Sequence, residues 1–548
     1  MFAIVAGYVW RVFMETSMPR IARRTAIATA AAALPRFAVA QSDTRPTVTV
    51  AVQRLATSNT LDILFEASNV GTRHYNLYIE PLIDTNWTGD LGLRPGLAES
   101  WRRIDGRTLE FTLRQNVKHH NGDAFTAEDV AWSYGERLFG AGDETPLAGG
   151  KPDPRWAPAK VRAGAKAAYP ALEKIEIVDS HTVRFVNRVP DVTLEGRVSM
   201  RTGCILNPRG FREAAGWMDW ARKPVGTGPY QVSEYRAENR LILEAFDGYW
   251  GGRPPIKTLR FLEVPELASR INGLKAGEFD FACDITPDQI PSIESSARHH
   301  VVGGLITNIR GLIFDQNHKI LKDPRIRRAL AHAVDRKVIV ETIWGGRTRV
   351  PNGLQFDYFG PMYVTDWKGI GFDPAEARRL LGEAGYRGEP IPFKVLANYY
   401  TNQVSTAQIL VEMWKAVGIN VDLQMRENWG QVLDGKVERA MNDNSFSAFF
   451  NDPVSFFPTT FGANGELEQG GYWRNAEAAA LIERIQTSTD IAARAADFRR
   501  VLEIVERDDP AVLVMHETAN FTAKRRDITW SPARSFVMDF RARNFAVG

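Results

Sequence analysis

Alternating apolar and polar positions predict short β-strands along the chain. Residues 47–52 read TVTVAV and residues 108–113 read TLEFTL, so every second side chain of each run should face a buried core. Gly106 lies in an Asp-Gly pair just before the second run and predicts a tight reversal of the chain there. Further strands are expected at 241–244, 311–314, 392–396 and 420–425.

Helical periodicity and capping residues predict helices between these strands. Thr126 is followed three residues later by Asp129, a carboxylate variant of the capping box, so a helix should begin there. Asp323 and Asp373 each precede a proline and should cap two further helices. The apolar residues of 325–334 recur at helical spacing, which should leave the arginines of this segment on a solvated face. The repeated alternation of strands and helices indicates an α/β fold.

Composition and charge narrow the class of protein. The 548 residues are enough for two or three domains, and 44% hydrophobic with 24% charged residues is ordinary for a soluble globular protein. The 68 basic and 65 acidic residues nearly balance, so nucleic acid is not an expected partner. Cys204 and Cys283 are the only cysteines, which allows at most one disulfide and excludes a multi-cysteine metal site.

The first 40 residues are interpreted as an export signal. Arg23 and Arg24 precede a weakly apolar run at 25–34, and a small-residue cleavage site ends at Ala40. The arginine pair favours the twin-arginine route, with a general secretory signal as the alternative because the usual Phe-Leu after the pair is missing. No cysteine lies at the cleavage site, so the lipoprotein signature is absent, and no later apolar run is long enough to span a bilayer. The mature protein is therefore expected to be free in the periplasm.

Several short segments occur in a fixed order along the chain. They read YIEPL from Tyr78, PGLAESW from Pro95, TAEDV from Thr126, PVGTGPY from Pro224, YWGG from Tyr249 and ALAHAVDR from Ala329. In this order they resemble the bacterial extracellular solute-binding proteins of family 5, the peptide-, nickel- and oligopeptide-type substrate-binding proteins of ABC transporters. The resemblance extends in register over most of the chain that follows the export signal.

The resemblance implies an α/β fold of the type II periplasmic binding proteins, with two lobes, a hinge and an extra inserted domain. Lobe I would be discontinuous and comprise residues 41–84, 200–305 and 516–548. The inserted domain would comprise residues 85–199, and lobe II residues 306–515. The ligand would then lie between the two lobes.

No catalytic or cofactor motif accompanies these segments. HExxH, CxxC, GxSxG and a Walker-type lysine are all absent from the sequence. The glycines of PVGTGPY are followed by Pro229 and a strand, so they are interpreted as a backbone turn and not as a phosphate-binding loop. No metal or other cofactor is expected, and the protein is expected not to be an enzyme. The alternative from another class is a secreted α/β enzyme.

The resemblance also indicates where this chain departs from the peptide-binding members. These carry an aspartate three or four residues before the proline of a GDYxxP-like motif, where it pairs with the α-ammonium group of the ligand. Counting back from Pro453, this position falls on Phe449 or Phe450, and Asp452 lies where it would start a helix. A phenyl ring cannot form the charge-assisted hydrogen bond of an aspartate. Phe449 and Phe450 therefore replace the amine anchor and are candidates for stacking on the ligand, with plain core packing of both as the competing interpretation.

Other candidate ligand-binding residues lie at the ends of predicted strands or in loops, where open α/β sheets bind their ligands. In chain order these candidates are Arg73, Tyr75, Asn398, Tyr399, Tyr400, Trp429, Asp452, Tyr472 and Trp473. For each of them, plain packing in the core or on the surface is the competing interpretation.

The predicted function is that of the periplasmic substrate-binding component of an ABC importer. Its ligand would be a small solute, either a peptide, an opine- or sugar-like molecule, or another compound that the sequence does not identify. Contacts with both lobes would favour a closed form, which membrane permease subunits would then bind. The protein is expected to be a monomer. Within the family, the alternative is a binding protein for nickel or a metal complex.

Overall fold

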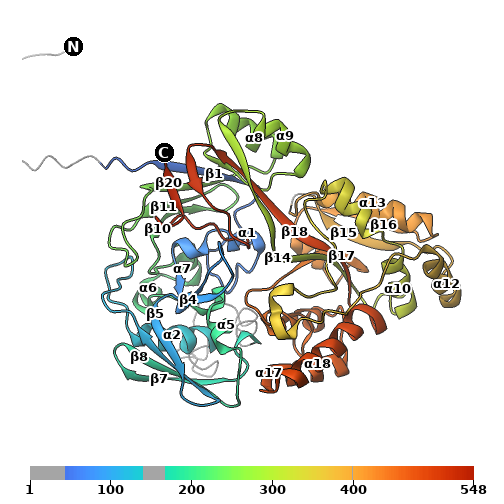
Figure 1. The fold of residues 1–548 in the computed structure, drawn as a ribbon, viewed down its shortest axis with the longest axis horizontal. Coiled ribbons are helices and arrows are strands. Elements are labelled where there is room, and N and C mark those ends of the chain that lie inside the picture. The colour runs from blue at the N-terminus through green and yellow to red at the C-terminus, as the bar shows by residue number, and fades with distance from the viewer. Residues whose placement is uncertain (1–42, 140–166, 398) are drawn as a thin grey trace, which may run out of the picture. The chain divides into compact units, whose positions relative to one another are not determined.

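The largest sheet has ten strands in the order β10-β11-β12-β1-β13-β18-β14-β17-β15-β16 (Figure 1). The computed structural model describes residues 43–139, 167–397 and 399–548, so the predicted export signal lies outside the described residues. In sheet order the strands are Tyr230–Arg236, Arg240–Ala245, Thr258–Glu263, Thr47–Val52, Phe281–Ala282, Val512–Arg525, His299–Phe314, Met441–Ser447, Ile391–Leu396 and Val421–Arg426. All the strands predicted for this sheet are confirmed, although β14 begins twelve residues before the predicted run at 311–314.

Two groups of strands are joined through β14 and β18. β1 pairs in parallel with β12 and β13, and β15 pairs in parallel with β16 and β17. β18 pairs with β13 and β14 pairs with β17, while β14 and β18 pair with each other in antiparallel fashion. The register between these two long strands shifts at Leu305/Ile309 and again at Arg310/Gly311. The regular ladder is therefore interrupted where the two groups of strands meet.

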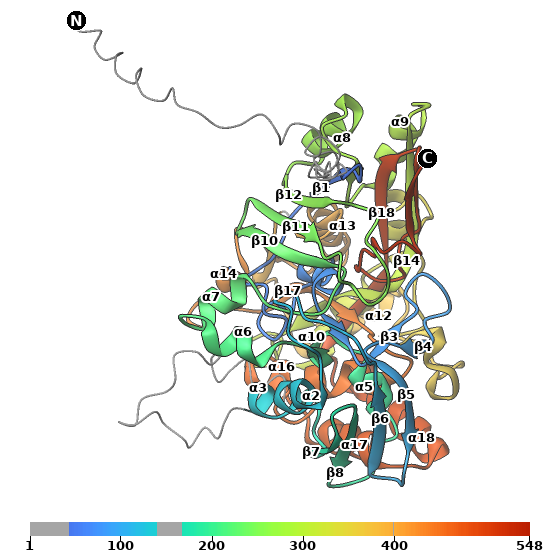
Figure 2. The ribbon, with the colours of Figure 1, turned by 90° about the vertical axis from the view of Figure 1, so that its left-hand side faces the viewer.

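A second sheet has four antiparallel strands in the order β5-β6-β8-β7 (Figure 2). These strands are Ala98–Arg103, Thr108–Leu113, Thr182–Asn187 and Leu172–Asp179. The predicted reversal before β6 is confirmed, and Leu109, Phe111 and Leu113 are all buried. The capping box is confirmed as well, since Thr126 caps α2 (Ala127–Tyr134) and Asp129 accepts a hydrogen bond from the Thr126 N–H. The whole sheet lies within the segment predicted as an inserted domain, whose boundaries remain a prediction.

Short strands and helices complete the described chain, in which no helix has the length and apolarity needed to cross a membrane. The remaining strands pair as β2 (Glu80–Pro81) with β9 (Cys204–Ile205), β3 (Ile83–Thr85) with β4 (Leu93–Pro95), and β19 (Ile528–Trp530) with β20 (Phe545–Val547). The remaining α-helices are α1 Asn69–Thr72, α3 Glu136–Phe139, α5 Leu194–Val198, α6 Pro208–Glu213, α7 Trp217–Arg222, α8 Leu267–Ala276, α9 Ile290–Glu294, α10 Pro324–His332, α11 Arg336–Val338, α12 Pro374–Ala384, α13 Gln403–Ala416, α14 Trp429–Leu433, α15 Phe457–Phe461, α16 Glu466–Gln469, α17 Ala476–Thr487 and α18 Ile491–Glu503.

The two predicted Asp-Pro helix starts are confirmed, but one expectation about charge is wrong. Asp323 and Asp373 cap α10 and α12 by accepting hydrogen bonds from backbone N–H groups of the first turn. Not every arginine of α10 is solvated, because Arg327 is only 1% exposed. Its guanidinium donates to Leu321 O and pairs with Asp509. A buried arginine is tolerated there because it has an acidic partner.

Three of the short sequence segments that carry the family resemblance meet at the buried carboxylate of Glu80. It accepts hydrogen bonds from Thr227 of PVGTGPY (3.0 Å) and from Tyr249 (2.7 Å) and Trp250 (2.9 Å) of YWGG. Near the C-terminus, Arg541 donates to the same carboxylate at 3.0 Å. These segments are therefore part of the scaffold.

The glycines of PVGTGPY are required by close backbone packing. A Cβ atom on Gly226 would lie 2.2 Å from Tyr78 O, and one on Gly228 would lie 2.5 Å from Leu77 O. Neither distance leaves room for a side chain. The interpretation of this segment as a backbone turn fits these contacts, which are made to protein backbone.

Both cysteines are buried and free. Cys204 lies in β9, and Cys283 follows directly after β13. Burial raises the pKa of the Cys283 thiol to about 11 and that of Cys204 well above its ordinary value. The single disulfide that the sequence allows is therefore not formed in this structure.

Buried Glu506 should make the stability of the protein depend on pH. Its carboxylate accepts a hydrogen bond from Leu354 N (2.7 Å), and burial raises its pKa from 4.5 to about 7. Between these two values the unfolded chain gives up a proton that the folded protein retains, so stability falls as pH rises. We expect Glu506→Gln to raise the free energy of unfolding by about 2–3 kcal/mol at pH 8 and by much less at pH 4.5.

Urea unfolding of both proteins at the two pH values measures this difference. Glu278→Gln, at an exposed position, serves as the control and should change neither value. An equal effect of Glu506→Gln at both pH values would contradict the expectation.

Candidate functional site

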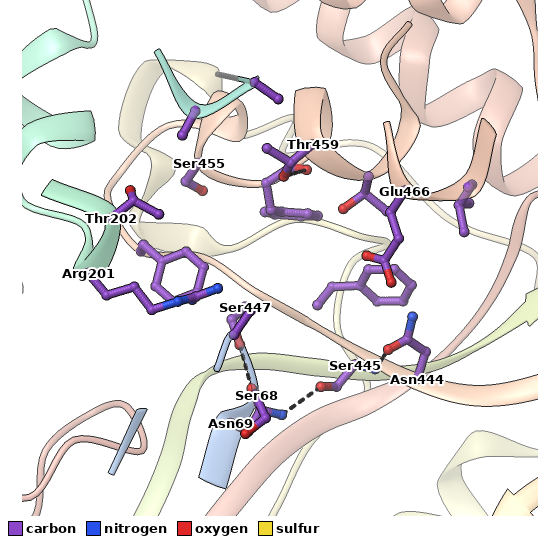
Figure 3. A pocket seen from close by; sticks show the side chains of 18 of the residues that line it. Ser68, Asn69, Arg201, Thr202, Asn444, Ser445, Ser447, Ser455, Thr459 and Glu466 are labelled. Atoms are coloured by element: carbon purple, nitrogen blue, oxygen red, sulfur yellow. Dashed lines mark hydrogen bonds between the residues drawn. The ribbon is translucent and has the colours of Figure 1, made fainter. Parts of the chain in front are cut away.

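A cavity of about 540 Å³ is lined by segments that lie far apart in the sequence (Figure 3). Ser68 and Asn69 come from the start of α1, and Arg201 and Thr202 from the short 3-10 helix Arg201–Gly203. The strand β17 and the residues after it contribute Asn442, Asn444, Ser445, Phe446, Ser447 and Phe449. The segment from Ser455 to Tyr472 and the aromatic residues Tyr399, Tyr400 and Trp429 line other parts of the wall.

Asn69 connects the start of α1 to β17 at the cavity. Its Nδ2 donates to Ser445 Oγ at 2.9 Å, and its Oδ1 accepts from Ser447 Oγ at 3.4 Å (Figure 3). Ser447 Oγ also accepts from Asn308 Nδ2 of β14 at 2.8 Å. A short polar network therefore fixes this part of the wall before any ligand binds.

Three aromatic side chains pack edge to face in another part of the wall. The ring centroids of Tyr399 and Tyr400 are 4.5 Å apart, and those of Tyr399 and Trp429 are 5.2 Å apart. The guanidinium of Arg310 lies 3.2 Å from the Tyr400 ring centroid and pairs with Asp443. Burial raises the pKa of Tyr400 to about 12, so its hydroxyl remains protonated at neutral pH and can donate a hydrogen bond.

Arg201 is one of two arginines in the wall, the other being Arg197, and sequence reasoning singled out neither of them. The guanidinium of Arg201 lies 5.1 Å from the ring centroid of Phe449, within the range of a cation-π contact. Burial lowers its pKa, and its Nε has no hydrogen-bond partner among the described residues. Nothing local in the sequence distinguishes this arginine, because its place beside Phe449 depends on the fold.

Three further buried polar atoms of the wall lack partners within the described part of the chain, one of them Tyr472 Oη. The other two are Asn442 Oδ1 on β17 and Ser455 Oγ in the 3-10 helix Pro453–Ser455. An unsatisfied buried polar atom costs about 1–3 kcal/mol, so such atoms are expected to meet a ligand or water. Tyr472 was among the residues singled out from the sequence, whereas Asn442 and Ser455 were not.

A second hollow of about 810 Å³ is larger, but its wall holds none of the unpartnered buried polar atoms of the described residues. Asp335, Lys337, Lys368 and Glu506 are among the residues that line it. The cavity beside Arg201 is therefore the stronger candidate for a solute site.

Five of the residues predicted from the sequence lie in the wall of the 540 Å³ cavity. They are Tyr399, Tyr400, Trp429, Phe449 and Tyr472. Arg73 lies in a small neighbouring cavity of about 30 Å³ and pairs with Asp284, and Tyr75 lies beside another cavity of about 20 Å³. Asn398 falls outside the described residues.

The structure places three other predicted residues in the core instead of the cavity wall. Phe450 is 4% exposed and packs against Gly196, where a side chain would collide with its ring. Asp452 pairs with Arg494, and Trp473 donates to Asp509 O at 3.0 Å. Phe449 and Phe450 lie in the irregular segment after β17, where Phe449 faces the cavity and Phe450 turns into the core against Gly196.

The chain belongs to the bacterial extracellular solute-binding proteins, family 5, whose family model matches residues 92–467. It is 26% identical over 486 residues to the dipeptide-binding protein of Escherichia coli K12, covering 85% of this chain and 87% of that protein. The fold is that of the type II periplasmic binding proteins.

Solved structures support the same fold. The periplasmic binding protein DppA from Helicobacter pylori, in complex with the peptide STSA, superposes with a TM-score of 0.79 at 20% identity, covering 92% of this chain and 98% of that one. NikA from Staphylococcus aureus, in complex with Ni(L-His)2, gives a TM-score of 0.76 at 19% identity, with 92% and 100% covered.

The nickel alternative is not favoured for this chain. No group of three or more His, Cys, Asp or Glu side chains that could hold a metal ion occurs among the described residues. The cavity wall is built mainly from amide, hydroxyl and aromatic side chains instead. Such groups suit an organic solute better than a bare metal ion.

Proposed function

We propose that this protein captures a small polar solute in the 540 Å³ cavity and delivers it, in the periplasm, to the permease subunits of an ABC importer. Membership of the solute-binding family supports this function. The observation that carries it is the cavity itself, whose polar wall is assembled from α1, the segment around Arg201, and β17. Binding proteins of this kind gain affinity by enclosing the solute between parts of the fold.

Capture would work through a shift between open and closed arrangements. The proposed lobe I (41–84, 200–305 and 516–548) and lobe II (306–515) would be connected through β14 and β18, with 85–199 as the inserted domain. A solute that contacts Asn69 and β17 together would favour the closed arrangement by its differential affinity. Permease subunits would then recognise the closed complex, and no bond in the solute would change.

Phe449 is proposed to contact the solute directly. Its ring lies in the wall next to Arg201, so truncation should remove both stacking area and the support of that guanidinium. We expect Phe449→Ala to weaken solute binding by about tenfold. Phe372→Ala, at a site 51% exposed and away from the cavity wall, should leave binding unchanged.

Native mass spectrometry of protein purified without added ligand supplies the solute for this measurement. A bound compound of defined mass is expected, which isothermal titration can then compare between the variants. Chemical conversion of that compound by the purified protein would favour the secreted-enzyme alternative. Absence of any bound or bindable solute would overturn the proposed function.

A further inference from the structure

The backbone that carries Arg201 is held firmly in place. Tyr134 Oη donates to Gly203 O at 3.0 Å, and Tyr169 Oη donates to Arg197 O at 3.0 Å. A Cβ atom on Gly203 would lie only 2.4 Å from Tyr134 Oη and 2.5 Å from Val198 O, so only glycine allows this packing. The guanidinium of Arg201 therefore extends from a turn that these contacts hold in place, and Figure 3 shows its side chain at the pocket.

Arg197, four residues before Arg201, has a structural role, because protein groups satisfy its guanidinium. Arg197 pairs with Asp191 at 3.1 Å and donates to Ala168 O (2.8 Å) and to Gln486 Oε1 (3.0 Å). Arg201, four residues later, has no acidic side chain within ion-pair distance among the described residues. Arg201 is partly buried, its Nε is fully buried without a partner in the described part of the chain, and a desolvated cation without a counter-ion is costly, so the cavity beside it suits an anion.

Two acidic side chains of this region, Glu66 and Glu466, do not serve as the counter-ion of Arg201. Glu66 acts on Arg201 through space, but its carboxylate accepts hydrogen bonds from Thr57 N at 2.9 Å and Ser58 N at 2.8 Å. Glu466 also belongs to the cavity wall and is drawn apart from Arg201 in Figure 3. Neither carboxylate forms an ion pair with Arg201.

We propose that Arg201 binds a carboxylate group of the transported solute, whose hydroxyl or amide groups pair with Asn442 and Ser455. This inference rests on the proposed function and names the substrate class: an organic acid that needs no free α-amino group. A planar guanidinium matches a carboxylate with two parallel hydrogen bonds. The phenyl ring of Phe449 holds the guanidinium from one side, while Asn442 Oδ1 requires a hydrogen-bond donor from the solute.

Two matched pairs of probes test the carboxylate directly. N-acetyl-alanyl-alanine is compared with its C-terminal amide, and galacturonate with galactose, by isothermal titration on the full mature protein. In the pair that binds, we expect the acid to bind about ten- to a hundredfold more tightly than the neutral partner. The two pairs also distinguish a blocked peptide from a sugar acid as the source of the carboxylate.

The same titrations on variants test whether Arg201 causes the preference for the acid over its neutral partner. Arg201→Gln should abolish the preference for the acid, and Arg201→Lys should retain part of it because the charge remains. Arg347→Gln removes an exposed arginine and should keep the full preference. Circular dichroism of each variant confirms that it is folded, and the probe pairs on the unaltered protein decide the point if Arg201→Gln does not fold.

Several results would overturn the assignment. These are equal binding of an acid and its neutral partner, an undiminished preference in Arg201→Gln, or no binding of either acid at about 1 mM. Tighter binding of alanyl-alanine than of its N-acetyl form would contradict the statement that no free amine is needed. If protein purified without added ligand retains a solute that lacks a carboxylate, the proposed function stands and the role of Arg201 is overturned.

Discussion

Replacing Glu80 with alanine is expected to lower the free energy of unfolding by about 3–5 kcal/mol, a large part of the stability of a typical domain. The buried carboxylate accepts hydrogen bonds from Thr227, Tyr249, Trp250 and Arg541. Its removal leaves three neutral donors without an acceptor and deprives Arg541 of one of its two acidic partners. Segments near residues 80, 227, 250 and 541 should then loosen together.

Urea unfolding followed by circular dichroism measures this loss, and hydrogen exchange locates it. Glu278→Ala serves as the matched control, because the same change at an exposed position should cost less than about 0.5 kcal/mol. A Glu80→Ala protein as stable as the control would show that the four hydrogen bonds contribute little.

Much of the fold could be predicted from the sequence because its signals are local. Strand alternation at 47–52 and 108–113, the capping box at Thr126, and the Asp-Pro pairs at Asp323 and Asp373 each depend on a few neighbouring residues. What these signals could not supply is the burial of Arg327, which depends on Asp509, a residue far away along the chain. Charge on an amphipathic helix is normally solvated, so the distant partner is needed to reverse that expectation.

The cavity could be predicted only in part, for a related reason. Aromatic residues at strand ends, such as Tyr399 and Trp429, were found because position relative to a strand is a local property. Arg201 was not found, because its significance lies in what is absent around it: an acidic partner that only the folded chain could have provided. Phe449 and Phe450 could not be told apart, because they are neighbours in the irregular segment after β17 and only the fold places Phe449 in the cavity wall and Phe450 against Gly196.

Asp452 shows how one residue can satisfy two interpretations of the same sequence. It was a candidate for ligand binding and also for a helix cap, and in the structure it caps the turn Pro453–Ser455. Both oxygens also accept hydrogen bonds from Arg494 Nη2, at 2.9 and 2.8 Å, in a buried environment. We therefore expect Asp452→Ala to cost about 3–5 kcal/mol of stability, because Arg494 would remain buried without a counter-ion.

Two comparisons distinguish the contribution of the Asp452–Arg494 ion pair to stability from that of the helix cap. Asp373→Ala removes an Asp-Pro cap that has no buried arginine partner among the residues the structure describes, and should cost only about 1 kcal/mol. The double variant Asp452→Ala/Arg494→Met should be more stable than Asp452→Ala alone, since it removes the orphaned charge. Equal losses for Asp452→Ala and Asp373→Ala in urea unfolding would mean that the buried pair adds nothing.

Solute binding distinguishes the structural role of Asp452 from a direct one. Because its carboxylate is bound to Arg494 and lies outside the cavity wall, folded Asp452→Ala protein should still prefer an acid over its neutral partner. Arg201→Gln should show the opposite pattern, with stability nearly retained and the preference lost. If Asp452→Ala loses the preference while Arg201→Gln keeps it, the buried Asp452–Arg494 pair shapes the solute site, and Arg201 does not bind the carboxylate.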